Sequence, residues 1–126
     1  MILDTNALIW MQQDNPKLGK AARRYIENAD SLFFSSMSIL EIEIKRMKSG
    51  IAIPKDFYQD LLDQGFIELK LSGQHAEALR QFTKLVVHDP FDRTLLATAY
   101  VEGHLLLTSD STLLNMGLPF VVDSQQ

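Results

Sequence analysis

The stretch "HDPFDRTLLATA", residues 88–99, joins a helix start to an apolar stripe. Asp89 is suited to the N-cap position, and Pro90 to the first helical position, because the φ angle of proline already fits a helix. The leucines and alanines that follow predict a helix over residues 90–102 with one buried side. Asp92 then lies one turn into that helix, where the helix dipole favours a negative charge.

The remaining chain alternates between strand-like and helix-like segments. Alternation of this kind predicts right-handed crossovers and a mainly parallel sheet. We therefore expect an α/β three-layer sandwich, with about five strands covered by helices on both faces, in one domain over residues 1–126. The expected strands are residues 1–4, 31–36, 66–71, 105–109 and 120–122, and the expected helices are 6–11, 17–28, 38–48, 54–64, 72–85 and 90–102.

Composition limits the possible functions. The 126 residues contain no cysteine, so any metal must be held by oxygen or imidazole. No apolar run approaches the ~20 residues of a membrane helix, and no export signal is recognisable, so we expect a cytoplasmic protein without membrane contact. His75 and His104 lie outside the motifs and are expected to be surface or core residues.

Charge argues against binding of nucleic acid by bulk electrostatics, because the net charge is −4. The distribution is uneven, however, since residues 1–48 hold seven of the twelve Lys and Arg against six acids. Lys17, Lys20 and Arg24 recur at near-helical spacing. This spacing is typical of a solvated helix face and is also compatible with a basic stripe that meets a polyanion.

Four acidic residues are expected at one edge of the sheet. Asp4 follows the first strand and Asp110 follows the fourth strand. Glu41 lies in the first turn of the helix after the second strand, and Asp92 in the first turn of the helix before the fourth. In open α/β sheets, ligands bind beyond the carboxyl ends of the strands. We therefore expect the four carboxylates to come together there.

Each of these acids also has a purely structural explanation. Asp4 and Asp110 are suited to capping or turn positions after a strand. Glu41 completes the pattern Ser38-x-x-Glu41 of a capping box and can pair with Lys45 one turn later. Taken one at a time, each of these acids is accounted for by its structural role.

Taken together, the four acids need a partner. Two unit charges ~5 Å apart repel by about 3 kcal/mol at an effective dielectric near 20, so four carboxylates would cost on the order of 10 to 20 kcal/mol. A typical domain has a total stability of only about 5–15 kcal/mol. A hard divalent cation suits oxygen ligands best, which indicates Mg²⁺ or Mn²⁺ and metal-assisted hydrolysis of a phosphodiester.

Four motifs, in order along nearly the whole chain, resemble those of the PIN domain family, and in particular VapC-type toxins of toxin–antitoxin pairs. The motifs are "LDTNALIW" at 3–10, "SSMSILEIEIK" at 35–45, "HDPFDRTLLATA" at 88–99 and "LLLTSD" at 105–110. The resemblance implies a metal-dependent endoribonuclease with sheet order 3-2-1-4-5. It also implies an RNA substrate, a homodimer, and a VapB-type antitoxin whose C-terminal segment occupies a groove beside the active site.

By this resemblance, Asp4, Glu41, Asp92 and Asp110 form the acidic constellation that binds Mg²⁺ or Mn²⁺. Asp4 and Asp92 would be the most direct ligands. Glu41 and Asp110 would complete the metal shell or orient water.

The resemblance also assigns supporting roles. Thr5, Asn6 and Thr108 match positions that support the carboxylates through hydrogen bonds. Arg93 is expected to contact a carboxylate or an RNA phosphate, and His88 to make a local hydrogen bond. Position 6 is Asn where many of these toxins have His.

Two rival functions would need different residues beside Asp4. A receiver-like phosphoacceptor needs an acidic pair after the first strand, and a phosphatase of the aspartyl-phosphate type needs a second Asp two residues after Asp4. Thr5 and Asn6 stand there instead. A PIN-like module that binds RNA or protein without cleavage, and a housekeeping RNA-processing nuclease, stay open as alternatives.

Overall fold

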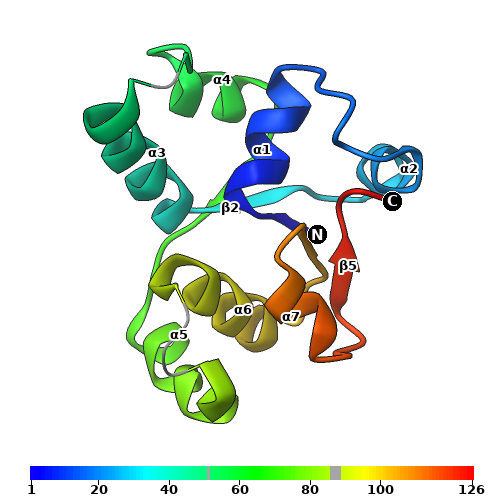
Figure 1. Cartoon of the computed structure of the whole chain (residues 1–126), viewed down its shortest axis with the longest axis vertical. Helices are drawn as coiled ribbons and strands as arrows, with labels where there is room; N and C mark the ends of the chain where they lie inside the picture. Colours follow the sequence, from blue (N-terminus) through cyan, green and yellow to red (C-terminus); the bar gives the residue numbers. More distant parts are fainter. Residues whose placement is uncertain (51, 86–88) are drawn as a thin grey trace.

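The computed structural model describes residues 1–50, 52–85 and 89–126, and it consists of short strands between longer helices (Figure 1). The strands are β1 (Ile2–Leu3), β2 (Phe33–Ser35), β3 (Ile67–Leu69), β4 (Leu106–Thr108) and β5 (Val121–Asp123). The helices are α1 (Thr5–Gln12), α2 (Lys20–Asn28), α3 (Ser36–Ser49), α4 (Phe57–Asp63), α5 (Gly73–Glu77), the 3-10 helix η1 (Ala78–Leu85), α6 (Pro90–Glu102) and α7 (Ser111–Asn115).

The five strands form one sheet in the order β3-β2-β1-β4-β5, and every neighbouring pair is parallel. The central strand β1 pairs with β2 through Ile2 and Phe33, and with β4 through Ile2 and Leu106. This confirms the expected fold class and the order 3-2-1-4-5. All carboxyl ends therefore lie at one edge of the sheet.

Consecutive residues of each strand enter two separate cores, because side chains alternate across a sheet. Leu3 and Leu107 join the core under α1 to α4, whereas Ile2 and Leu106 join the core under η1, α6 and α7. Figure 1 shows α1, α3 and α4 on one side of the sheet and α5 and α6 on the other. The sheet is thus covered on both faces, as in a three-layer sandwich.

Helix α6 begins and ends where its sequence indicates. The Asp89 carboxylate accepts a 2.8 Å hydrogen bond from the Phe91 main-chain N–H, and Pro90 is the first helical residue. Residues 94–99 are buried. The helix ends at Gly103, whose φ of 70° suits glycine.

The expected capping box at Ser38 is wrong. Helix α3 begins at Ser36, and the Ser35 hydroxyl caps it by accepting from the Met37 main-chain N–H. Ser38 therefore lies inside the helix, where it is buried. Several serines near the end of β2 can each cap a helix, and the local sequence does not distinguish among them.

The expected single helix over residues 72–85 is also wrong. The chain forms α5 and then η1, with non-helical backbone at Phe82, whose side chain is buried in the core beside α6. The expected helix 17–28 begins only at Lys20, after Gly19. The short helix α7 was not expected. No helix among the described residues is long and apolar enough to span a membrane.

Candidate carboxylate site

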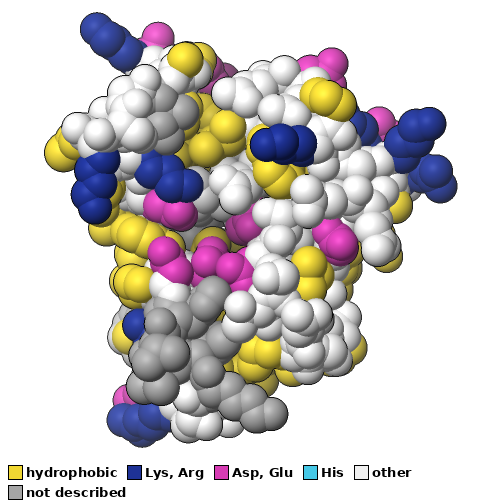
Figure 2. Space-filling view, in the orientation of Figure 1, with side chains coloured by type: hydrophobic (Ala, Val, Ile, Leu, Met, Phe, Trp, Pro, Cys, Tyr) yellow, Lys and Arg dark blue, Asp and Glu magenta, His cyan; other side chains and the backbone are white. Residues whose placement is uncertain are grey.

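Two of the four predicted acids end central strands and begin helices at the carboxyl edge of the sheet. Asp4 follows β1 and caps α1, and Asp110 follows β4 and caps α7. The Asp110 carboxylate accepts a 2.9 Å hydrogen bond from the Leu113 main-chain N–H. The capping role considered from the sequence is therefore present at both residues. Figure 2 shows acidic side chains gathered in the middle of the face drawn, in the region between α3 and α6 in Figure 1.

Asp4 is buried, with 5% of its surface exposed. Its Oδ1 accepts from the Ala7 main-chain N–H at 2.8 Å, and its Oδ2 accepts from the Thr108 hydroxyl at 2.7 Å. Burial raises the pKa of Asp4 to about 6, although hydrogen bonds from Ala7, Thr108 and Ser109 oppose the rise. The negative charge of Glu41 raises the pKa further. These hydrogen bonds therefore fix the orientation of the Asp4 carboxyl group, while burial disfavours its ionised form.

Asp92 lies one turn into α6 and has the most strongly shifted carboxyl group of the site. Burial raises its pKa to about 8, and the charge of Asp110 and a hydrogen bond with Asp110 add to the rise. The charges of Asp89 and Asp4 contribute as well. Asp110, Asp89 and Asp4 are therefore near enough to Asp92 to disfavour the ionisation of its carboxyl group.

Glu41 differs from the other three acids because it already has a cationic partner. Its Oε2 lies 3.1 Å from Lys45 Nζ, one turn along α3. Its Oε1 accepts a 2.6 Å hydrogen bond from the Thr5 hydroxyl, and Thr5 Oγ1 lies 3.1 Å from Ser38 Oγ. The charge of Glu41 still reaches Asp4, since it raises the pKa of that residue.

Ser38 contacts the site, although the sequence predicts a helix-capping role for it. The spacing Ser38-x-x-Glu41 fits a capping box, but three residues along a helix also place two side chains on one face. Here that face turns toward Thr5. The sequence signal that could have identified Ser38 as a site contact is therefore its position, three residues before a candidate acid on an expected helix.

The other predicted site residues are placed less centrally. Asn6 is exposed on α1, and within the described ranges its side chain makes no hydrogen bond. Arg93 is partly buried beside Asp92 in the first turn of α6. His88 lies outside the described residues, so its expected hydrogen bond stays a prediction.

The two remaining histidines lie apart from the acids. His75 is buried, and its Nε2 lies 2.8 Å from Glu102 Oε1, while its Nδ1 accepts from the Ser72 main-chain N–H. His104 is partly buried and stacks on Phe33 with ring centroids 4.3 Å apart. Both fit the expected surface or core positions.

The fit of a metal ion depends on the donor chemistry of the four acids. Among residues 1–50, 52–85 and 89–126, no three carboxylate or imidazole groups already stand as a ligand shell. The donors at this edge are oxygens, and burial, together with neighbouring negative charge, raises the pKa values of Asp4 and Asp92. Oxygen donors with excess negative charge fit a hard divalent cation.

Fold and site together define a three-layer α/β protein with a carboxylate-lined edge. A family model described as PIN domain matches residues 1–117, and the chain belongs to this family. The family expected from the four motifs is thereby confirmed.

The similar proteins carry related names. Ribonuclease VapC22 of Mycobacterium tuberculosis is 26% identical over 115 residues, which is 90% of this chain and 88% of that protein. A toxin–antitoxin complex from Klebsiella pneumoniae contains a chain with TM-score 0.68 and 21% identity, covering 98% of this chain and 96% of the other. The DNA-bound VapBC of Salmonella typhimurium gives a TM-score of 0.65 at 20% identity, covering 97% and 94%. The VapBC2 structure from Rickettsia felis, bound to a promoter DNA fragment, gives 0.64 at 18%, covering 96% and 94%. At these identities, the structural likeness shows the fold.

Proposed function

We propose that this chain is a metal-dependent endoribonuclease and the toxin of a VapBC-type toxin–antitoxin pair. The observation that carries the proposal is the electrostatic contact among Asp4, Asp92 and Asp110, which come from distant parts of the chain. The similar protein named as a ribonuclease and the similar toxin–antitoxin complexes support it.

Asp4, Glu41, Asp92 and Asp110 would hold Mg²⁺ or Mn²⁺. A divalent cation supplies Lewis acidity there, because it lowers the pKa of a bound water and stabilises charge that builds on a phosphoryl oxygen. The raised pKa values of Asp4 and Asp92 fit this role, since a cation would favour the ionised forms that burial disfavours.

The chain's own side chains orient the reaction. In hydrolysis, a water oxygen bonds to phosphorus, one phosphorus–oxygen ester bond breaks, and the water gives up a proton. Thr108 and the Ala7 main-chain N–H hold both oxygens of Asp4, so its direction is set before substrate arrives. Glu41 is held by Thr5 and Lys45, and a carboxylate in this position can orient the water or accept its proton.

The proposal includes a VapB-type antitoxin, a homodimer and a cytoplasmic location. Helix α3 has an apolar, solvent-facing side that a protein partner would cover: Leu40 is 48% exposed and Met47 is 84% exposed. Co-purification with the product of an adjacent small gene, followed by light scattering of each species, tests both partners. Recovery of a monomer alone, with no bound protein, would contradict them.

Cleavage is tested with purified protein and single-stranded RNA. We expect cleavage with Mg²⁺ or Mn²⁺ and none with a chelator, and we expect Asp4→Asn and Asp92→Asn to abolish cleavage while circular dichroism shows an intact fold. Asp56→Asn is the matched control, because Asp56 is exposed near α4 and its side chain makes no capping bond. Cleavage that continues in chelator would refute the metal mechanism.

Expression of the chain alone in a bacterium separates the alternatives. Growth arrest that Asp92→Asn relieves would support a toxic nuclease. Cleavage without growth arrest would favour a housekeeping RNA-processing nuclease. RNA binding with no cleavage would favour a module that binds without cutting.

A further inference from the structure

A second concave surface lies at the opposite edge of the sheet from the acids. It is a hollow of about 720 Å³ between α2 and the amino ends of the central strands. Phe33 begins β2, and Leu105 directly precedes β4, and both line the hollow. In a parallel sheet, the amino ends lie away from the carboxyl ends, where Asp4 and Asp110 lie. The hollow is therefore separate from the carboxylate site.

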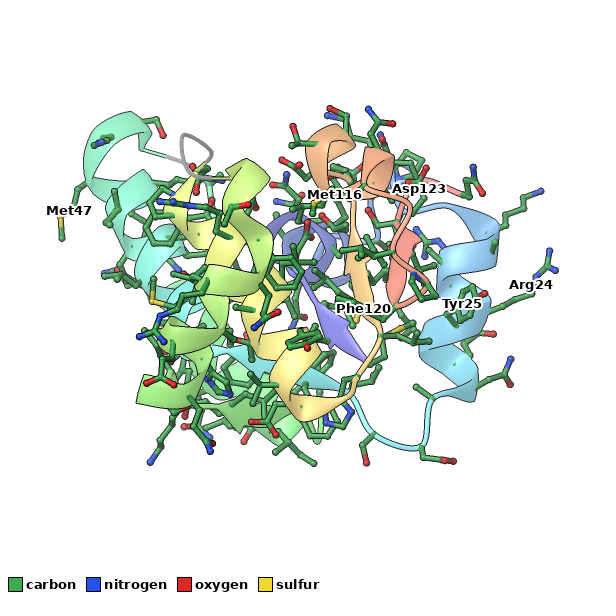
Figure 3. The ribbon with its side chains drawn as sticks, turned by 90° about the horizontal axis from the view of Figure 1, so that it is seen from below. Arg24, Tyr25, Met47, Met116, Phe120 and Asp123 are labelled. Carbon is green, nitrogen blue, oxygen red and sulfur yellow. The ribbon has the colours of Figure 1, made fainter. Side chains whose placement is uncertain are left out.

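The hollow is lined by aromatic rings. Tyr25 comes from α2 and is 47% exposed, while Phe33 and His104 stack on each other on the sheet side. Figure 3 shows Tyr25 and Arg24 on the same turn of α2, with Arg24 extending outward into solvent. Burial lowers the pKa of His104, so its ring is neutral near pH 7 and offers a flat, uncharged face.

One basic residue borders these rings, and a second lies one turn earlier on α2. Arg24 lines the hollow, and Lys20 lies four residues earlier on the same face of α2, exposed like Arg24. These two residues belong to the basic stripe of α2. The sequence of this stripe is compatible with either a solvated helix face or a contact with a polyanion. Asp30 also lines the hollow, and its carboxylate would accept from an amino group rather than approach a phosphate.

The surroundings disfavour an extended peptide as the occupant. Strands β1, β2 and β4 are interior strands of the sheet, so the hollow offers no free strand edge for pairing. Rings beside an arginine instead match a planar base with a linked phosphate, since bases stack on aromatic side chains and arginine binds phosphate. A volume of about 720 Å³ lies within the range of ordinary ligand sites.

We propose that this hollow binds an unpaired nucleotide of single-stranded RNA, with the base against Tyr25 and the phosphate at Arg24. The proposal rests on the ribonuclease function proposed above and adds an RNA contact outside the carboxylate site. Such a contact would hold a flexible part of the substrate while another part lies at the acids. It would also offset the repulsion between RNA and a chain with a net charge of −4.

Binding is measured by fluorescence anisotropy of a short, labelled single-stranded RNA in chelator. We expect Tyr25→Ala to weaken binding by about five- to tenfold and Tyr25→Phe to bind like wild type, because stacking needs the ring and not the hydroxyl. Arg24→Glu should weaken binding by about tenfold and flatten the salt dependence. Arg80→Glu is the matched control, since it makes the same charge change at an exposed residue of η1, outside the residues that line the hollow. Equal losses in Arg24→Glu and Arg80→Glu would overturn the proposal.

Photo-crosslinking with RNA that carries 4-thiouridine gives a second measurement. We expect crosslinked peptides from residues 21–33 in wild type and fewer in Arg24→Glu. Crosslinks confined to the carboxylate edge would overturn the proposal. A third outcome is tight binding of free AMP in the hollow with no RNA crosslink there. This result would indicate a site for small nucleotides and would also overturn the proposal.

The two proposals fail in different ways. If wild type cleaves RNA with Mg²⁺ and the Arg24 and Tyr25 variants bind RNA like wild type, only the second contact is wrong. If wild type neither binds nor cleaves RNA, the ribonuclease function is wrong, and the nucleotide site falls with it.

Discussion

A single hydroxyl connects two of the acidic segments at the residue scale. Thr108 Oγ1 donates to Asp4 Oδ2 at 2.7 Å and accepts from the Asp110 main-chain N–H at 3.1 Å. Asp4, in turn, caps α1. The same side chains therefore stabilise the fold and position the site, which is why the structural and the functional explanation of each acid need not exclude each other.

Replacement of Thr108 by valine tests this connection. Thr108→Val keeps the shape but removes both hydrogen bonds, and it leaves a fully buried carboxylate with one donor fewer. We expect the free energy of unfolding to fall by about 1–3 kcal/mol, measured by urea denaturation. Thr112→Val on the exposed side of α7 is the control and should change stability little. An unchanged unfolding midpoint in Thr108→Val would contradict the role of this hydroxyl.

The raised pKa of Asp92 predicts a pH-dependent stability in metal-free protein. The folded-state pKa is about 8 against 3.8 for the unfolded chain, so the folded state binds more protons between these values. Stability should therefore fall as pH rises from about 4 to about 8. In chelator above pH 8, Asp92→Asn should be more stable than wild type by roughly 1 to 3 kcal/mol, a figure reduced for partial solvent access.

Thermal unfolding across this pH range measures the difference in stability between wild type and Asp92→Asn. The gap between the two proteins should close as the pH falls below about 4, where Asp92 becomes protonated in the unfolded chain as well as in the folded protein. A wild type whose stability rises steadily from pH 5 to pH 8 in chelator would contradict the raised pKa.

At the scale of elements, the N-terminus of α2 depends on a distant segment. Gly19 has no capping side chain, and the first N–H groups of α2 are satisfied by main-chain carbonyls that follow β5: Gly19 N–H bonds to Ser124 and Ala21 N–H to Gln126. This contact explains why α2 begins at Lys20 rather than at Lys17. The periodic apolar pattern alone could not predict it, because its cause lies about 100 residues away in the chain.

Gly19→Ala should break this contact. A Cβ at position 19 would lie 2.3 Å from the main-chain carbon of Gln126 and 2.5 Å from that of Gln125, so the two segments must separate. We expect a loss of roughly 1–3 kcal/mol in the free energy of unfolding, with faster hydrogen exchange at the start of α2. Gly73→Ala is the matched control, since a Cβ there meets nothing within 4 Å. Equal stability of both variants would show that the chain end does not anchor α2.

At the scale of the whole molecule, the sheet order brings the acids together. Asp4 and Asp110 directly follow neighbouring central strands. Asp92 instead lies in the first turn of α6, which covers the face of the sheet opposite to α1. The mutual repulsion of these groups is a property of the assembled fold, because they are 88 and 18 residues apart along the chain and distant when unfolded.

A divalent cation that relieves this repulsion should stabilise the folded protein. We expect Mn²⁺ to raise the melting temperature of wild type in a concentration-dependent manner, because a ligand that binds only the folded state adds RT ln(1 + [L]/Kd) to stability. Asp4→Asn and Asp92→Asn should reduce the shift, and Asp56→Asn should retain it. A melting temperature that Mn²⁺ leaves unchanged at millimolar concentration would contradict binding at this site.

The sequence alone determined the fold class, the succession of the five strands along the chain, the start of α6 and the identity of the candidate acids. These features depend on local signals: alternation, proline and aspartate at a helix start, and acids directly after apolar strands. Only the tertiary structure decided that Ser35 rather than Ser38 caps α3, that the chain bends at Phe82, and that Ser38 contacts Thr5. The last two depend on side chains that pack against segments far away in the chain, and such long-range contacts leave no local signal in the sequence.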